Sequence, residues 1–281
     1  MKKIISFTAS FVIAQLMMAQ TNTNAILLLK GQKISVNNDV TIDADLGMGM
    51  QLNSVTASIN SLQVKDSDTN NYTISNTLTK LKINMNMMGQ NNTYDSDNKD
   101  GNNADMAKIF DDKMNKVNDV MIDKTTGAVI APKQAVIKDS DEDANNISEN
   151  MMKMFSNTSD VAVVEGAFEI LPAGKKTGDS WADTSKTADT KTIRTYTLQS
   201  VTGNEAVMNI ETTVKATNKL DFQGMEFEIN TDTKTTGQVL FDISTGMVKK
   251  RDTVSDITGS FQMMGQDMPI TAKTTTKTVY N

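Results

Sequence analysis

The chain has 281 residues, a formal net charge of −6, 5% aromatic residues, and neither cysteine nor histidine. The missing residue types exclude disulfides, thiolate metal sites, cysteine nucleophiles and a serine triad that depends on histidine. An acidic chain without a basic cluster is also an unfavourable partner for nucleic acid. Methionine occurs 20 times, so we expect it to fill much of a core that has few aromatic rings.

The first 19 residues resemble a secretory signal peptide. Lys2 and Lys3 precede an apolar run from Ile4 to Met18, and the small residue Ala19 follows it. The run is too short, and too often interrupted by polar residues, to be a membrane span. We therefore expect an exported protein, periplasmic or extracellular. Removing the two lysines would give a net charge of −8 (−6 − 2) and leave no transmembrane segment.

The residues that follow are expected to form antiparallel strands. Ala25–Leu29 is a short apolar run typical of a buried strand, and apolar residues then alternate from Val36 to Ala44. A longer strand carries Leu52, Val55, Ala57 and Ile59, and its return strand ends at the Met87–Gln90 turn. The alternation changes phase between Ile59 and Leu62, which predicts a β-bulge.

Two segments have apolar residues at helical spacing. They predict helices from about Asn103 to Val117 and from Asn145 to Phe155. The second follows the acidic segment Lys138–Asp143, and acidic residues favour a helix N-terminus. We interpret the apolar segment Val161–Gly166 as a short strand.

The clearest hairpin of the sequence lies in Leu220–Phe227. Apolar residues alternate on each side of Gln223-Gly224, and period-two alternation around such a turn is typical of a β-hairpin. The pattern predicts that Phe222 pairs with Met225 on the buried face.

A second hairpin is predicted around Gly265-Gln266. In this register Met263 pairs with Met268, and Phe261 pairs with Ile270. Both hairpins place methionine beside aromatic residues.

Two short motifs occur twice in the chain. The pattern Asp-x-x-Thr-Gly-x-Val begins at Asp123 and again at Asp242, 119 residues later (242 − 123), and Met87–Gln90 has the same letters as Met263–Gln266. The repeats indicate either two related halves, residues 25–135 and 165–281, or independent use of the same turn chemistry. In both cases we expect one β-rich domain over residues 20–281.

Several short motifs resemble a family of uncharacterised exported proteins known mainly from Bacteroidota, which contain a domain of unknown function. The motifs are Lys30-Gly31-Gln32, Leu171-Pro172, Gly178-Asp179-Ser180-Trp181, Thr195-Tyr196-Thr197-Leu198 and Asp242-Ile243-Ser244-Thr245-Gly246. The resemblance implies secretion and a β-rich fold, and it implies no known activity or ligand.

Methionine and phenylalanine gather near the predicted turns. If the hairpins curl together, these side chains would line a soft apolar groove suited to an acyl chain or a hydrophobic peptide. The alternative is that they fill the core. The ligand-lining residues predicted in this way are Met85, Met87, Phe222, Met225, Phe227, Phe261, Met263 and Met268.

Metal sites and catalysis have little support in the sequence. The methionines have no histidine or cysteine to complete a copper site. The segment Asp95–Gly101 resembles a calcium loop, but Lys99 takes a ligand position and the final glutamate is missing. The acidic residues are scattered, and no nucleophile elbow or phosphate loop is present. We expect no metal, no cofactor and no enzymatic activity.

The predicted fold is mainly β, with long antiparallel strands in a curved sheet or half-barrel and one or two packed helices. The predicted function is to bind or carry a hydrophobic ligand, a lipid or hydrophobic peptide, in the cell envelope. The alternative is a surface or structural protein-interaction module without a small-molecule ligand. It would use exposed Thr-rich strands such as Lys273–Tyr280 for partner contact or strand addition.

Overall fold

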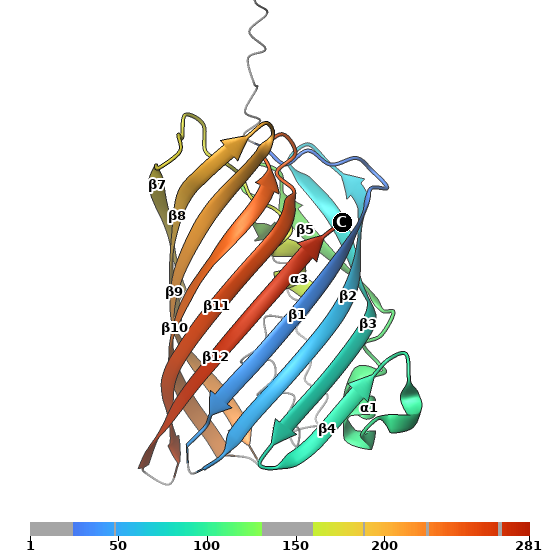
Figure 1. Cartoon of the computed structure of the whole chain (residues 1–281), viewed down its shortest axis with the longest axis vertical. Coiled ribbons are helices and arrows are strands. Elements are labelled where there is room, and N and C mark those ends of the chain that lie inside the picture. The colour runs from blue at the N-terminus through green and yellow to red at the C-terminus, as the bar shows by residue number, and fades with distance from the viewer. Residues whose placement is uncertain (1–24, 48, 131–159, 188, 223–224, 264–265) are drawn as a thin grey trace, which may run out of the picture.

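One antiparallel sheet contains all the described strands. The computed structural model describes residues 25–47, 49–130, 160–187, 189–222, 225–263 and 266–281, without the side chains of residues 160, 218–228 and 261–267 (Figure 1). Among these residues, twelve strands form one sheet in the order β6-β5-β3-β2-β1-β12-β11-β10-β9-β8-β7, and β4 also pairs with β3. The long strands run obliquely and curve around an interior. The predicted fold class is confirmed.

The strands of the first segment are β1 (Lys33–Asp45), β2 (Gln51–Ser67), β3 (Asn71–Met87), β4 (Gln90–Asp95), β5 (Val117–Asp123) and β6 (Val129–Ile130). Those of the second segment are β7 (Ser180–Lys186), β8 (Thr190–Thr202), β9 (Glu205–Phe222), β10 (Met225–Asp242), β11 (Val248–Met263) and β12 (Gln266–Tyr280). Strands β1 and β12 pair along ten residues each, from Val36↔Tyr280 to Asp45↔Thr271, and so join the two segments into one sheet.

Two short α-helices and one 3₁₀ turn, η1 (Lys99–Gly101), occur among the described residues. Helix α1 (Ala104–Phe110) begins after Asn103, whose side chain accepts hydrogen bonds from the backbone N–H groups of Asp105 and Met106. The predicted start is confirmed, but the predicted end at Val117 is wrong because that residue opens β5.

Helix α3 (Asp160–Glu165) replaces the short strand predicted for Val161–Gly166. A short apolar run does not distinguish a strand from a buried helical turn, which explains the error. In Figure 1, α3 lies on the concave side of the sheet and α1 lies beside β4. The predicted helix Asn145–Phe155 lies outside the described residues.

Within the described part of the chain, no helix is long and apolar enough to cross a lipid bilayer.

The two predicted hairpins differ in outcome. Phe222 pairs with Met225, as predicted. In the second hairpin, Met263 pairs with Gln266 and Phe261 with Met268, so the predicted register is wrong by two residues. The paired positions leave a two-residue connection whose second residue is glycine. The same arrangement joins β3 to β4, where Met88 and Gly89 have φ angles of 54° and 80°, as a type I′ turn requires.

The middle of strand β2, Val55 to Ile59, faces the opposite way from the one its apolar residues predict, whereas Leu52 and Leu62 point inward. Ser54, Thr56, Ser58 and Asn60 point inward and are buried, whereas Val55 is 54% exposed on the outer face. The register does shift between Ile59 and Asn60, as a bulge requires, but inward and outward positions of β2 alternate without interruption. The apparent phase change therefore reflects polar residues at inward positions.

The interior consists of two apolar cores with polar side chains between them. The α3-side core includes Ile34, Val36, Leu62, Ile74, Val164, Phe168, Leu198, Met208, Val239, Phe241 and Tyr280. The α1-side core includes Val40, Ile42, Leu52, Leu81, Ile83, Met85, Tyr94, Met106, Phe110, Ile229 and Ile270. Along β12, Tyr280 belongs to the first core and Ile270 to the second, and Thr274 and Thr278 lie buried between them. We call the buried polar side chains between the cores the polar layer: Asn38, Thr56, Ser58, Asn60, Asn76, Thr274 and Thr278.

The segment Ala25–Leu29 closes the α3-side end without forming the predicted strand. Ile26 is fully buried, and its N–H donates to the carbonyl of Lys124 at 2.7 Å. The N–H of Leu27 donates to the carbonyl of Thr245 at 3.0 Å. These two acceptors belong to the two Asp-x-x-Thr-Gly turns, so the repeated motif holds one apolar residue from two sides.

The two turns also share their internal hydrogen bonds. In each, the aspartate Oδ1 accepts the N–H groups of the residues two and three positions later, and the glycine N–H donates to the aspartate carbonyl. Gly127 and Gly246 both have positive φ, and a Cβ at either would lie 3.2–3.3 Å from a side-chain carbon of Ile26. The similarity is one of geometry, and whether it arose by duplication stays a prediction.

Glycine lets β10 and β11 approach closely where the sheet curves. A Cβ at Gly237 would collide with the carbonyl oxygen of Asp252 and lie 2.8 Å from the Thr253 methyl carbon. We expect Gly237→Ala to lower the free energy of unfolding by roughly 1–3 kcal/mol, because the added carbon has no space. The exposed neighbour Thr236→Ala, the control, should cost less than about 1 kcal/mol. Equal effects in urea denaturation would contradict this account.

Candidate functional site

A cavity of about 660 Å³ lies on the concave face of the sheet. Strands β7 to β12 and β1 contribute its walls, together with α3, residues 166–169 after it, and the turn around Gly127. This volume falls within the range of small-molecule sites, about 300–1,000 Å³. Threonine and serine hydroxyls form much of the wall, at Thr212, Thr233, Thr235, Thr253, Ser255, Thr274, Thr276 and Thr278.

One line of polar residues crosses six neighbouring strands. The registers place Asp183 beside Arg194, Arg194 beside Thr212, and so on across β7 to β12. Residues directly opposite one another in a sheet point to the same face. We call this line the polar row: Asp183, Arg194, Thr212, Thr235, Ser255 and Thr274. All six residues line the cavity.

Arg251 forms a buried ion pair at the α3-side end of the cavity. Its Nη2 lies 2.6 Å from Glu169 Oε1, and its Nε donates to the Gly166 carbonyl at 3.3 Å. The two side chains are only 19% and 16% exposed. Burial alone would lower the pKa of Arg251, but the Glu169 carboxylate more than offsets this and raises it. The pair fixes the segment after α3 against β11.

Arg194 is held more loosely than Arg251. Its guanidinium nitrogens lie 3.5 Å from Glu165 Oε1 and 4.0 Å from Asp183 Oδ1. Both distances exceed the roughly 2.7–2.9 Å of a charge-assisted hydrogen bond. The side chain is 37% exposed. Arg194 therefore keeps N–H donors that a bound molecule can use.

Two aromatic rings fix the neighbouring part of the wall. Tyr196 stacks on Trp181 with 5.6 Å between ring centroids and an interplanar angle of 18°. The Tyr196 hydroxyl donates to Asp183 Oδ2 at 3.2 Å. Burial, followed by the nearby carboxylates of Glu169 and Asp183, raises the pKa of Tyr196. Tyr196 therefore remains a neutral donor, and its partner Trp181 packs against the α3-side core.

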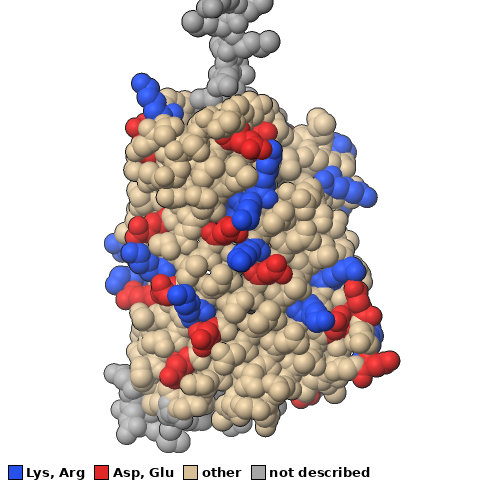
Figure 2. Space-filling view, viewed as in Figure 1, with Lys and Arg blue, Asp and Glu red and all other residues tan. Residues whose placement is uncertain are grey.

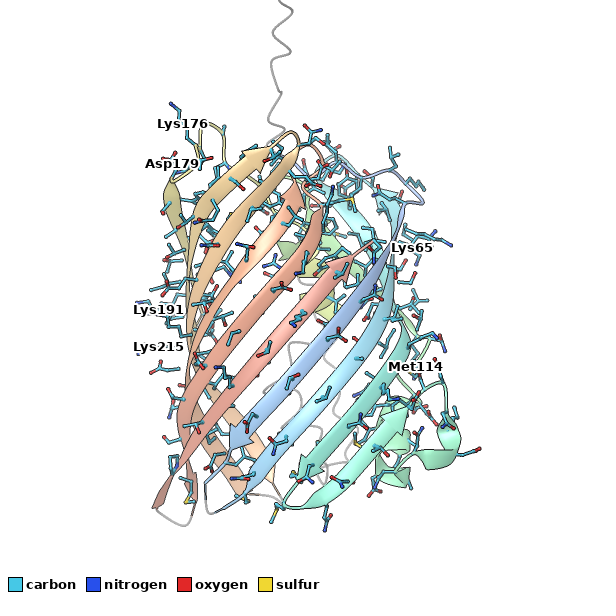
Figure 3. All side chains as sticks on the ribbon, viewed as in Figure 1. Lys65, Met114, Lys176, Asp179, Lys191 and Lys215 are labelled. Atoms are coloured by element: carbon cyan, nitrogen blue, oxygen red, sulfur yellow. The ribbon has the colours of Figure 1, made fainter. Side chains whose placement is uncertain are left out.

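Arginine and lysine are used on different faces. The chain contains only two arginines, Arg194 and Arg251, and both line the cavity. Lysines lie on the outside: Figure 3 shows Lys65, Lys191 and Lys215 pointing away from the sheet. On the face in Figure 2, positive and negative side chains alternate. Arginine offers a rigid fork of donors that lysine lacks, so its restriction to the cavity indicates directional hydrogen bonding there.

Four hydroxyls of the cavity wall have no hydrogen bond to another described residue. They belong to Thr212, Thr233, Thr253 and Thr276, which are all half-buried. Elsewhere in the wall hydroxyls are paired: Thr278 donates to Asn38 at 2.8 Å, and Thr235 and Ser255 lie 2.7 Å apart. The four remaining hydroxyls can donate to, and accept from, a molecule inside the cavity.

Three of the eight predicted methionine and phenylalanine residues have described side chains, and these three do not line the cavity. Met85 is buried in the α1-side core, Met87 packs against that core, and Met268 is buried near Gly47. The side chains of Phe222, Met225, Phe227, Phe261 and Met263 are outside the described part of the chain. None of the eight predicted residues is among the described residues that line the cavity. The apolar groove stays a prediction.

The hydroxyl-lined wall was missed because threonine occupies both faces of these strands. The available signal was the inward series of β12, where Thr274, Thr276 and Thr278 follow two-residue spacing. Strand β12 pairs with β1 on one side and β11 on the other. It therefore offers no open edge, and the prediction of strand addition at Lys273–Tyr280 is wrong.

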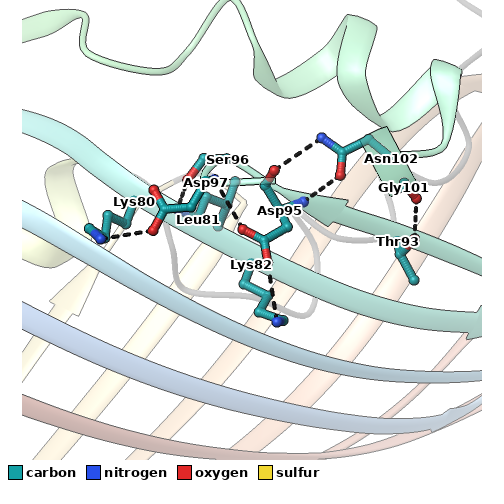
Figure 4. A network of polar contacts seen from close by, with 9 residues as sticks. All are labelled: Lys80, Leu81, Lys82, Thr93, Asp95, Ser96, Asp97, Gly101 and Asn102. Atoms are coloured by element: carbon teal, nitrogen blue, oxygen red, sulfur yellow. Dashed lines mark hydrogen bonds and ion pairs between the residues drawn. The ribbon is translucent and has the colours of Figure 1, made fainter. Parts of the chain in front are cut away.

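Two lysines of β3 pair with carboxylates of the loop that resembles a calcium site. Lys80 Nζ lies 2.8 Å from Asp97 Oδ2, and Lys82 Nζ lies 3.1 Å from Asp95 Oδ2 (Figure 4). Asn102 donates to the Asp95 carbonyl at 3.1 Å and accepts from its N–H at 2.7 Å. The carboxylates thus hold the loop against β3. Within the described residues, no group of three or more acidic side chains has the arrangement that holds a metal ion.

These features define a curved β-sheet protein with a polar interior cavity. The model of a family of unknown function, DUF6263, matches residues 69–248, and the chain belongs to this family. The expected membership of an uncharacterised family is thereby confirmed, whereas its link to Bacteroidota, its export and its motifs stay predictions. None of the curated proteins matches the sequence.

Three solved structures of Pseudomonas proteins have a weak likeness to the chain. They are Pseudomonas aeruginosa OpdQ (6% identity, TM-score 0.26, covering 90% of this chain and 100% of that one), Pseudomonas aeruginosa OccK5, also called OpdH (7%, 0.23, 89% and 98%), and an outer membrane channel from Pseudomonas putida F1 (8%, 0.21, 91% and 97%). TM-scores this low carry no argument about the fold or function of this chain.

Removing one partner of the Arg251–Glu169 pair should destabilise the protein strongly. We expect Arg251→Met to cost about 3–5 kcal/mol, because it leaves a buried carboxylate without its cation. Arg251→Met combined with Glu169→Leu should recover much of this loss in urea denaturation. The exposed pair Lys215–Asp232 is the control, and Lys215→Met should cost under about 1 kcal/mol. If the loss of unfolding free energy in the double variant equalled the sum of the losses in Arg251→Met and Glu169→Leu, the account would be contradicted.

Burial of Tyr280 predicts a loss of stability in alkali. Burial is the main cause that raises its pKa to about 12, against about 10 in an unfolded chain. The folded state therefore keeps a proton that the unfolded state releases. Stability that is fully present below about pH 10 should fall as the pH rises through 12. In urea denaturation between about pH 9 and 11, the free energy of unfolding should fall less steeply with pH in Tyr280→Phe than in the wild-type protein. If the slope of unfolding free energy against pH were the same in both proteins, Tyr280 would not be the cause of the alkaline loss of stability.

Proposed function

We propose that this protein is an exported, non-catalytic binding protein that holds a small polar ligand in the cavity of its concave face. The single observation that carries the proposal is the set of four half-buried threonine hydroxyls that face the cavity without a described partner. These hydroxyls are partly exposed, so a polar molecule of ligand size that enters the cavity can replace water on them and take over its hydrogen bonds.

Other features support the remaining parts of the proposal. The first 19 residues have the pattern of an export signal. The charged side chains of the cavity are arranged as partners of one another: Glu169 binds Arg251, and Asp183 accepts from Tyr196. Such pairing suits a site that binds and orients a molecule more than one that needs a free base or nucleophile.

The proposal changes the ligand class that the sequence suggests. The methionine-rich composition predicts a hydrophobic ligand, whereas the cavity wall combines hydroxyl, amide and charged groups with a few apolar side chains. A purely apolar ligand would leave those polar groups without partners, which costs about 1–3 kcal/mol for each group. The cavity therefore favours a ligand that can hydrogen-bond.

Native mass spectrometry of the protein purified from its own host tests the proposal. We expect a reproducible polar adduct in the wild-type protein. The inward variant Thr233→Val plus Thr276→Val should lower its affinity roughly tenfold, because two hydrogen bonds of about 0.5–1.5 kcal/mol each are lost. The outward variant Thr236→Val plus Thr271→Val, on the same strands, should retain it.

Two other results would contradict the proposal. One is a protein that carries no adduct and gains no thermal stability from a library of polar metabolites. The other is a co-purifying lipid that the inward threonine variant retains and a folded Met85→Asp variant loses. That second result would support the hydrophobic ligand predicted from the methionines.

A further inference from the structure

The charged groups of the cavity restrict the kind of polar ligand that fits. Two guanidinium groups, Arg194 and Arg251, and three carboxylates, Glu165, Glu169 and Asp183, line the same space. Arg251 and Glu169 neutralise each other at 2.6 Å. The groups left for a ligand are Arg194 and the two carboxylates within 4.0 Å of it.

An ionic ligand meets a group of like charge at this position. A carboxylate or phosphate placed on Arg194 would lie next to two carboxylates, Glu165 and Asp183, so an anion is repelled overall. An ammonium group placed on either carboxylate would lie next to Arg194, which cancels much of the attraction of that carboxylate. Like charges at such distances repel by about 1 kcal/mol or more, even in a well-solvated site. A neutral ligand avoids this cost and can still use both kinds of group, because an uncharged hydroxyl accepts from a guanidinium and donates to a carboxylate.

The hydroxyls of the wall point to the same chemistry. The polar row carries Thr212 directly next to Arg194, and Thr253 and Thr276 lie opposite each other one inward position away. Each hydroxyl donates once and accepts up to twice, so it matches a ligand that presents many groups of the same kind. A molecule with one polar head and an apolar tail would leave most of this surface unmatched.

We propose that the ligand of this cavity is a neutral, hydroxyl-rich molecule of the short-oligosaccharide class. Arg194 and Asp183 determine its specificity from one end of the polar row, and the threonines hold its remaining hydroxyls. Tyr196, fixed by its stack on Trp181, adds an aromatic surface to the wall for the C–H face of a sugar ring. This inference rests on the proposed function, which it narrows from a polar ligand to a neutral saccharide.

Titration calorimetry of the full mature protein with defined sugars tests the inference. The probes are maltose, cellobiose, lactose and chitobiose as neutral disaccharides, digalacturonic acid as an anion, and glucosamine as a cation. We expect at least one neutral disaccharide to bind more tightly than both charged probes. Its affinity should change less than twofold between low salt and about 0.5 M salt, because screening acts only on net charge–charge attraction.

The variants separate directional hydrogen bonding from charge. Arg194→Met should weaken binding of the neutral disaccharide at least tenfold, and Arg194→Lys should weaken it nearly as much because the fork of donors is lost. Asp183→Asn should alter which disaccharide binds best. Lys191→Met, an exposed site three residues earlier on the same strand, should leave binding unchanged.

The outcomes distinguish this inference from the function on which it rests. Salt-sensitive binding of digalacturonic acid or glucosamine, lost in the inward threonine variant, would overturn the neutral-saccharide inference and leave the cavity as a polar binding site. Binding that Arg194→Lys fully retains would also overturn it, since charge alone would then suffice. Absence of any adduct or polar ligand for the cavity would overturn both proposals.

Discussion

The burial of a polar layer between two apolar cores is the constraint on which this structure depends. A buried polar group without a partner costs about 1–3 kcal/mol, so the layer needs either internal hydrogen bonds or an occupied space. Within the layer, Asn60 donates to Asn76, and Thr278 donates to Asn38, where β1, β2, β3 and β12 meet. Next to the layer, half-buried threonine hydroxyls of β9 to β12 face the cavity. The position of the cavity thus follows from the layering of the interior.

The closed end of the interior depends on contacts between distant parts of the chain. Ile26 lies between two turns of the same sequence pattern, and the Arg251–Glu169 pair ties the segment after α3 to β11. Gly166 completes this wall, because a Cβ there would lie 2.7 Å from the Tyr280 hydroxyl. The apolar residue, the ion pair and the glycine each hold backbone at a fixed distance from the sheet. Together they give the cavity a wall opposite its strands.

Local patterns in the sequence predicted the strands well and the inward faces less well. The hairpin at Gln223-Gly224 and the Asn103 cap were predictable because neighbouring residues determine them. The inward face of β2 was not, because apolar Val55 lies outside and polar Thr56 lies inside. The polar row was also hidden, since Arg194 and Thr274 are brought together only through the registers of five strands. Long-range pairing, which carries no local signal, decides the site.

The use of the two arginines links this architecture to binding. Replacing a buried ion pair by apolar side chains is often neutral or stabilising, so stability alone gives little reason to keep Arg251 and Glu169. Their geometry gives a better reason. The pair fixes the residues after α3, and with α3 in this position Glu165 lies 3.5 Å from Arg194, too far for a strong hydrogen bond. One guanidinium is therefore satisfied by the protein, and the other is left with donors that face the cavity. For the proposed ligand, this arrangement would hold the directional groups ready before binding, which lowers the entropic cost of binding.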